Sequence, residues 1–247
     1  MRHNPAQVKV FAESLPNSYK AGFDWAAIAE QAALSQRRQP GHPAVGICFA
    51  ARFPGHALCV IADDRPGLLA TISASLISER LDVIAAEAYT RRVSDTSREA
   101  VDIFWVRSVD IGDRERALSN ERLTHLESTL DRLLNEHYDP KDARIPTQPP
   151  PSRTDASETI VRFIEDKNGT LTTLEVETSD RTGMLLVLSR SLHQQHVQIV
   201  SSTVRTEKSR VKDRFELTEL DDSPIGPQRR LLVQMAVLEA IQQSFGR

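Results

Sequence analysis

Apolar residues follow two spacings along the chain, and the two spacings alternate in the same order twice. Two strand-like runs, 44–53 and 56–63, are joined by a Pro-Gly turn. A second pair of runs, 159–166 and 170–179, is joined by Lys167-Asn168-Gly169, a sequence typical of hairpins. Each of two blocks is therefore predicted to open with a β-hairpin.

A helix and a second strand pair follow in each block. The first predicted helix of each block has leucine and isoleucine at three- and four-residue spacing, at Leu69, Ile72 and Leu76, and at Leu185, Leu188 and Leu192. Runs rich in β-branched and aromatic residues come next, at 81–92 and 98–110, and at 197–208 and 210–220. The closing helices carry the same apolar spacing, at Leu123, Leu126, Leu130 and Leu133, and at Leu231, Met235, Leu238 and Ile241. The order is strand, strand, helix, strand, strand, helix, twice.

This order predicts an α+β protein with two ferredoxin-like domains. Hairpin strands are antiparallel and a strand–helix–strand crossover is right-handed, so each block should form a four-stranded antiparallel sheet with two helices on one face. The position of one strand stays open. The strand at 159–166 can pair within the second block through its hairpin, or it can complete the sheet of the first block, which would leave the strand at 44–53 to pair elsewhere. No strand follows the last helix of the second block, so we expect strand edges to pair between blocks or between chains.

Composition changes divide the chain into four segments. Residues 1–42 are expected to form a helical connector with one short helix, which begins after a plausible Asp24 N-cap. The first domain should span 43–138 and the second 158–247. Between them, the Pro-rich and charged segment 139–157 has no periodicity and is predicted to be a semi-rigid spacer.

The turn before the first helix of each block is itself repeated. "DDRPGLL" begins at Asp63 and "SDRTGML" at Ser179, so Asp64 and Asp180 are 116 residues apart, as are Gly67 and Gly183. A helix that opens at such a turn presents amides without internal partners at the positive end of its dipole, where a carboxylate is favoured. The aspartate can cap those amides, or can receive the ammonium of a ligand whose carboxylate they bind. An α-amino acid carries both groups.

Composition and motifs exclude several classes of function. Lys and Arg number 31 against 34 Asp and Glu, a net charge of −3, which gives no basic excess for binding nucleic acid. Two cysteines, a polar N-terminus and no long apolar run favour a cytoplasmic protein without membrane contact.

No catalytic centre is predicted. His193 and His196 have no third ligand nearby, so we expect no metal site. Asp63 and Asp64, as neighbours on a strand, point to opposite faces and would not share a proton. No phosphate loop or nucleophile motif is present, so we expect neither a cofactor nor enzyme activity.

The repeated turns carry a family resemblance. "DDRPGLLATISASL" followed by "LDVIAAEAYTRR", and "SDRTGMLLVLSRSL" followed by "VQIVSSTVRTEK", resemble the signature of ACT domains, which typically bind amino acids. From about Pro43 onward the chain is similar to the C-terminal tandem ACT region of bacterial PII uridylyltransferase/uridylyl-removing enzymes, and "ESLPNSYKAGFDWAAIAEQAAL" resembles the connector before it. The resemblance implies a regulatory protein that senses glutamine and signals to a partner in nitrogen or amino-acid metabolism.

The same resemblance implies a ligand-binding set at the two turns and the strands beyond them. Its members are Asp64, Arg65, Gly67, Leu68, Asp82 and Ile84 in the first block, and Asp180, Arg181, Gly183, Met184, Gln198 and Ile199 in the second. The family often has Asn where this chain has Asp82 and Gln198, and Pro where it has Thr182. A charge at Asp82 disfavours an anionic ligand, so the second block is predicted to be the better site.

Two other readings remain open at this point. The domains can have lost their ligands and serve only for interaction or homodimerisation, or the chain can be the detached regulatory tail of a uridylyltransferase. In the plainest reading, each turn aspartate is only an N-cap and each apolar wall residue only part of the core.

Overall fold

The computed structural model describes residues 4–50, 52–110, 118–136, 138–145, 158–164, 172–207 and 209–245. The described helices are α1 (Pro5–Glu13), α2 (Asn17–Gly22), α3 (Trp25–Arg37), α4 (Leu68–Ser78), α5 (Asn120–Asn135), α6 (Met184–Gln194) and α7 (Pro227–Phe245). The described strands are β1 (Ala44–Ile47), β2 (His56–Asp63), β3 (Leu81–Arg92), β4 (Arg98–Ser108), β5 (Ile160–Ile164), β6 (Thr172–Ser179), β7 (Val197–Glu207) and β8 (Arg210–Glu219). The predicted turn at 167–169 and most of the predicted spacer, 146–157, lie outside the described residues.

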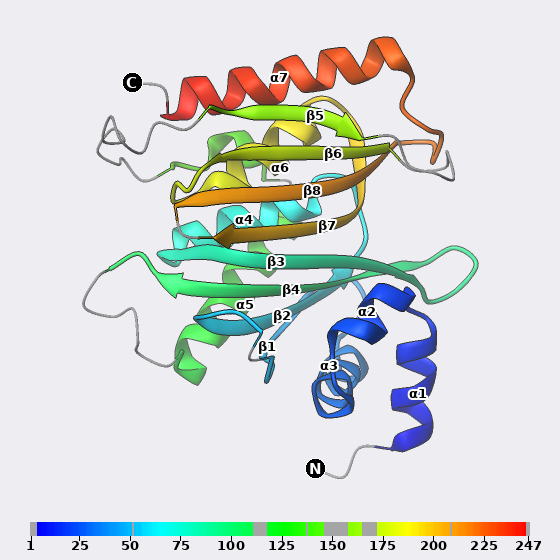
Figure 1. The fold of residues 1–247 in the computed structure, drawn as a ribbon. Helices are drawn as coiled ribbons and strands as arrows, with labels where there is room; N and C mark the ends of the chain where they lie inside the picture. Colours follow the sequence, from blue (N-terminus) through cyan, green and yellow to red (C-terminus); the bar gives the residue numbers. More distant parts are fainter. Residues whose placement is uncertain are drawn as a thin grey trace.

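The strands form a single antiparallel sheet rather than two separate ones (Figure 1). Its order is β1-β2-β4-β3-β7-β8-β6-β5, so each half contributes four neighbouring strands in mirror-image sequence. The halves join where β3 pairs with β7, from Ala85 opposite Arg205 to Ala88 opposite Ser202. Pairing removes two edges that would otherwise expose unpaired backbone groups. The expected pairing between blocks is therefore found, within the chain.

The opening hairpins lie at the two outer edges of the sheet. β1 pairs with β2, and β5 pairs with β6, so the strand near 160 belongs to the second half and the other predicted arrangement is wrong. β1 covers only Ala44–Ile47 of the longer predicted run. The strand that a ferredoxin-like plan usually places last has moved to the front in both halves.

The crossovers through α4 and α6 repeat one local geometry. Gly67 and Gly183 precede these helices with φ of 80° and 83°, a left-handed conformation that glycine adopts without strain. After each helix the strand carries a bulge, between Val83 and Ala85 in β3 and between Ile199 and Ser201 in β7. The sequence repeat is therefore also a repeat of backbone structure.

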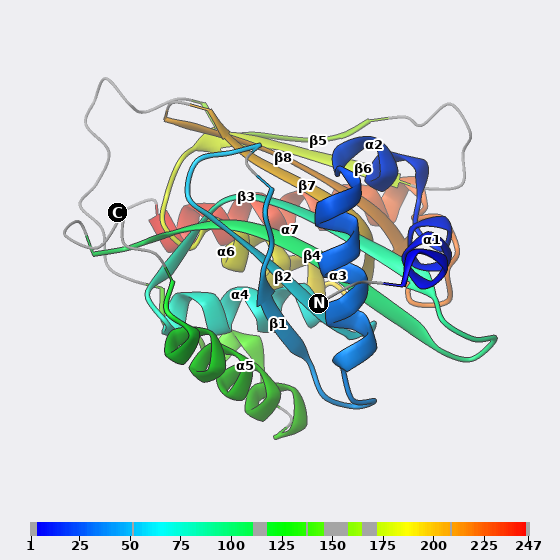
Figure 2. The same ribbon diagram turned by 90° about the horizontal axis from the view of Figure 1, so that it is seen from below.

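Helices cover the two faces of the sheet unequally (Figure 2). The apolar sides of α4, α5, α6 and α7 pack on one face along its whole width. On the opposite face, the helices among the described residues cover the first half alone, through α1, α2 and α3. No helix in the described ranges combines the length and the apolar composition needed to cross a bilayer.

The single helix predicted at the N-terminus is wrong, because the segment forms three. Pro16 precedes α2 with φ of −59°, and the Asp24 carboxylate accepts the amide of Ala27 at 2.8 Å to start α3, as predicted. Tyr19, which has no exposed surface, packs edge-on against Tyr89 of the sheet. Proline and the cap divide the segment, and burial of aromatic rings holds the pieces in place.

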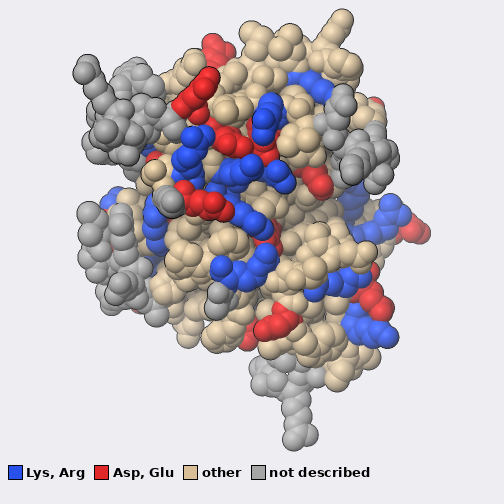
Figure 3. Space-filling model, viewed as in Figure 1, with Lys and Arg blue, Asp and Glu red and all other residues tan. Residues whose placement is uncertain are grey.

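Side-chain character explains why only the first half is covered. Cys59 and Ile103 lie on the outer face of the first half and are fully buried under the N-terminal helices. The same row of the sheet continues through Arg214 and Glu175 to Arg162 in the second half. These three residues form a charged ladder, with Glu175 bound to both arginines, and Figure 3 shows charged side chains gathered over this half of the face. A charged surface of this kind offers no apolar area for a helix to bury.

Two aspartates interrupt the apolar core beneath the helices. Asp102 of β4 and Asp213 of β8 are 3% and 0% exposed. Neither carboxylate oxygen of Asp213 has a hydrogen-bond partner among the described residues. Burial raises the pKa of Asp213 well above its ordinary value; the backbone N–H of Arg205 opposes the rise, and the nearby charge of Asp180 adds to it. Asp213 is therefore held in its neutral form well above the pH at which an exposed aspartate ionises.

We predict that Asp213→Asn removes a pH-dependent loss of stability. Between the ordinary pKa and the raised one, the folded wild type binds more protons than the unfolded chain, so its unfolding free energy falls by about 1.4 kcal/mol per pH unit. The variant lacks this proton, so its stability relative to wild type should rise from pH 5 to pH 7 in urea denaturation. The exposed Asp95→Asn serves as control. A difference between variant and wild type that does not change with pH would refute the assignment.

Candidate functional site

The first repeated turn connects β2 to α4. Asp64 follows β2 directly, Pro66 contributes no amide, and Gly67 turns the chain so that Leu68 begins the helix. The carbonyl of Gly67 accepts the Thr71 hydroxyl at 3.1 Å. Within the described part of the chain, no group accepts the Gly67 amide. This turn therefore keeps a free donor at the positive end of α4.

A residue of the second half completes the first turn. The side-chain nitrogen of Gln198, at the start of β7, lies 3.3 Å from an oxygen of the Asp64 carboxylate. Burial raises the pKa of Asp64, while Arg98 and the Gln198 amide oppose the rise. An acid, a free amide and a carboxamide thus converge from both halves of the sheet.

A small cavity of about 30 Å³ lies beneath this turn, enough for a water molecule or two. Leu68 and Ile199 contribute apolar walls, and the buried Asp102 also lines the cavity. The imidazole of His193 covers Gly67, since a Cβ added at Gly67 would lie 2.7 Å from it. The cavity as it stands is too small for an amino acid, and the half-buried His193 side chain covers the Gly67 backbone.

The second turn has the same backbone but different neighbours. Asp82, at the start of β3 in the first half, directs one carboxylate oxygen at the amide of Gly183, 3.2 Å away. Arg107 binds the other oxygen of Asp82 at 2.9 Å and a carboxylate oxygen of Asp180 at 3.3 Å. Burial raises the pKa of Asp82, with Arg107 opposing the rise. Burial alone would lower the pKa of Arg107, but the two carboxylates outweigh it and raise that pKa.

The strand residues thus serve the opposite turns. Sequence reasoning assigned Gln198 to the second turn and Asp82 to the first, and on that basis favoured the second. In the structure Gln198 faces Asp64 and Asp82 faces Gly183, so the premise of that preference is wrong. The cause is the antiparallel pairing of β3 with β7, which carries the start of each strand to the other half.

The remaining predicted site residues are the two helix starts, the arginine within each turn, and Ile84. Leu68 and Met184 open α4 and α6 and are buried. The Arg65 guanidinium donates to the carbonyl of Leu134 at 2.7 Å, near the end of α5. Ile84 lies against Gly55, in the turn between β1 and β2. Arg181 accepts the amide of Met184 through its carbonyl at 3.0 Å, as the turn requires.

Sequence reasoning missed Arg107, Asp102, Asp213 and the role of His193. Arg107 gives no local signal, because its partner Asp180 lies 73 positions away. Asp102 and Asp213 could have been identified from the sequence, because each places an acid among the apolar, inward-facing positions of a buried strand. In the described ranges no three His, Cys, Asp or Glu side chains are grouped so that they could hold a metal ion.

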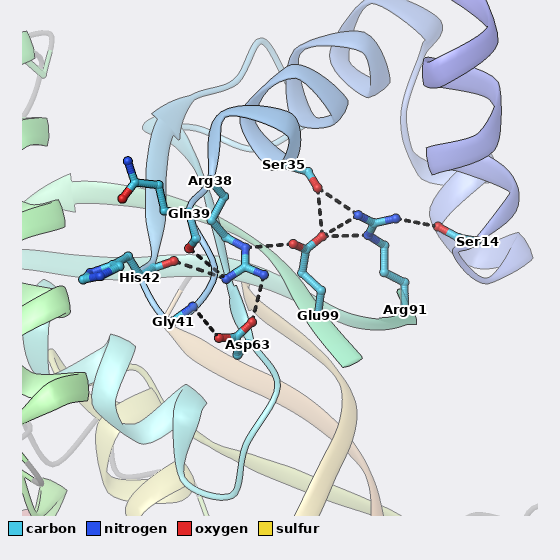
Figure 4. A network of polar contacts seen from close by, with 9 residues as sticks. All are labelled: Ser14, Ser35, Arg38, Gln39, Gly41, His42, Asp63, Arg91 and Glu99. Atoms are coloured by element: carbon cyan, nitrogen blue, oxygen red, sulfur yellow. Dashed lines mark hydrogen bonds and ion pairs between the residues drawn. The ribbon is translucent and has the colours of Figure 1, made fainter. Parts of the chain in front are cut away.

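The first turn is also connected to the N-terminal helices (Figure 4). Arg38, just after α3, binds Asp63 at 2.8 Å and the buried Glu99 at 2.8 Å. Arg91 of β3 binds Glu99 at 2.7 Å and donates to the Ser14 hydroxyl after α1 at 3.2 Å. Since Asp63 precedes Asp64, this network joins the turn directly to the connector.

Comparison with known proteins gives one consistent result. No protein-family model matches the chain. A bifunctional uridylyltransferase/uridylyl-removing enzyme of Rhodospirillum rubrum is 30% identical over 193 residues, 76% of this chain and 20% of that enzyme. The enzyme of the same name from Phenylobacterium zucineum is 23% identical over 95% of this chain and 24% of its own length. The enzyme of the same name from Azospirillum brasilense is 27% identical over 65% of this chain and 17% of its own length.

The expected resemblance to these enzymes is confirmed. The chain spans less than a quarter of the length of the relatives just described. Their name describes whole enzymes, and what it says of catalysis belongs to those proteins. This chain is therefore similar to one region of bifunctional uridylyltransferase/uridylyl-removing enzymes.

Proposed function

We propose that the chain is a regulatory region with two ACT-like, ferredoxin-like domains, at 43–138 and 158–247, that senses a small amino acid. The resemblance to the uridylyltransferase supports this, as does the repeated strand–turn–helix unit. Glutamine is the favoured ligand by the same resemblance. The chain then signals to a partner in nitrogen or amino-acid metabolism and needs no catalytic residues of its own.

The observation that carries the proposal is the free amide of Gly67 at a cavity that Asp64 and Gln198 also line. The amide and the dipole of α4 suit the ligand's carboxylate. The Asp64 carboxylate suits its ammonium, and the Gln198 side chain offers hydrogen bonds to either group. Leu68 and Ile199 provide apolar contacts for the ligand's side chain. His193 must rotate away, which a half-buried side chain at a helix end can do.

The Arg38 network offers a route for the signal. A ligand that draws Asp64 toward its ammonium displaces Asp63, and Arg38 joins Asp63 to Glu99 and the end of α3. In a longer protein, the connector helices would pass that displacement to neighbouring domains. This arrangement agrees with the alternative that the chain is the detached tail of a uridylyltransferase.

A second candidate function is an interaction module without a ligand. Its support is the small size of the cavity at the first turn and a row of exposed apolar side chains on α7, Leu231, Leu232 and Met235. Homodimerisation or binding to a separate nucleotidyltransferase would cover such a row. A partner that binds equally well with and without amino acids would favour this function.

We predict that isothermal titration with the twenty amino acids detects one that binds, with glutamine favoured. Asp64→Ala should weaken its affinity at least about tenfold, because a charged hydrogen bond contributes about 1.5–3 kcal/mol. Gly67→Ala should also weaken binding, since φ is 80° at Gly67 and an alanine there would strain the turn that positions the free amide. Asp95→Ala is the exposed control. Absence of binding by the wild type, or equal affinity in all variants, would contradict the proposal.

We predict that Glu99→Gln releases the N-terminal helices. Arg38 and Arg91 have side chains only 8% and 14% exposed, so removing their shared charge should cost about 3 kcal/mol. Amide hydrogen exchange should then rise across α1 and α3 while the second half keeps its protection. Glu13→Gln, which breaks an exposed pair with Lys9, should cost about 0.5 kcal/mol or less. Unchanged exchange in the helices of the Glu99 variant would overturn this anchoring role.

A further inference from the structure

The two repeated turns differ in whether the amide of their glycine has a hydrogen-bond acceptor. At the first turn the Gly67 amide has no acceptor among the described residues. At the second, the Gly183 amide donates to the carboxylate of Asp82, 3.2 Å away. The position that matches Asp82 in the second half, 116 residues later, is Gln198. Its side chain is neutral and donates to the Asp64 carboxylate of the first turn rather than accepting from the glycine amide. One chain therefore contains the same turn once with an anion in place and once without.

The anion at the second turn is firmly held. Asp82 is only 3% exposed, so its carboxylate is not shared with solvent. Its second oxygen is fixed by Arg107, and Arg107 also neutralises Asp180. The carboxylate thus has an amide donor on one oxygen and a guanidinium on the other, which are the contacts that a bound free carboxylate would need.

We propose that Asp82 is a built-in carboxylate ligand of the second turn and closes it to free carboxylates, so that the tandem has one open turn. An incoming carboxylate would need the Gly183 amide that Asp82 occupies. It would also meet two carboxylates, Asp82 and Asp180, that share a single arginine. The amide and the arginine of the second turn select carboxylates as its ligand class. Only the identity of the ligand at the first turn rests on the proposed function.

Arg107 has a separate part in this arrangement. With Asp82 present, the ion pair with Arg107 holds the Asp82 carboxylate against the turn. With Asp82 removed, Arg107 still pairs with Asp180, but the guanidinium donor that held Asp82 is left beside the freed amide of Gly183, next to the positive end of α6. Replacing one side chain should therefore convert a closed turn into an anion site.

The test follows the Gly183 amide by 15N NMR in the full chain while sodium acetate is added, and in a second titration L-glutamine. In the wild type this resonance should not respond to either probe. In Asp82→Ala it should shift and saturate, with a dissociation constant at least about tenfold lower than any limit set for the wild type. Asp95→Ala should behave as the wild type.

Asp82→Asn guards against a variant that fails to fold. It keeps the volume of the side chain but removes its charge, so it should give a saturable but weaker response than Asp82→Ala. A silent Gly183 resonance in both folded variants would overturn the proposal, as would a wild-type Gly183 that titrates like the variants. The Gly67 resonance reports the proposed function separately: if it ignores every amino acid, that function fails while the assignment of Asp82 stands.

Discussion

The antiparallel pairing of β3 with β7 is the interaction on which both turns depend. It makes one sheet from two halves and aligns α4 beside α6 on the covered face. Because these strands run in opposite directions, the start of each lies beside the turn of the other half. Asp64 meets Gln198, and Gly183 meets Asp82, only through this pairing. Each turn therefore obtains one of its polar contacts from the other half.

The rest of the architecture follows from where apolar side chains face outward. A single row crosses the sheet from Cys59 and Ile103 in the first half to Arg214 and Glu175 in the second. Where the row is apolar, the N-terminal helices bury it, and where it is charged, no helix of the described residues covers it. This placement brings Arg38 to Asp63, so the connector contacts the first turn.

Local signals in the sequence were enough to predict the strands, the crossover helices and the repeated turns. Hairpin dipeptides, helical spacing and the left-handed glycines depend on neighbours within a few residues. Pairing between the blocks could be expected from their free strand edges. The choice of β3 and β7 as the pairing strands, the division of the N-terminal segment into three helices and the exchange of Asp82 and Gln198 depend on distant contacts. Asp82 and Gly183 are 101 positions apart, and no pattern around either residue indicates the other. The sequence therefore indicated the residues of the two turns but not which residues contact each other across the halves.

Covalent fusion of the halves has a consequence for how the two turns can change. In a symmetric dimer of identical chains, every substitution appears at both turns, so a charge that closes one closes the other. In this chain the corresponding positions are encoded separately, and they hold an acid at one place and an amide at the other. A repeat within a single chain therefore allows the two turns to differ in role. One turn can stabilise the contact between the halves, while the other keeps an amide that a ligand from solution can bind.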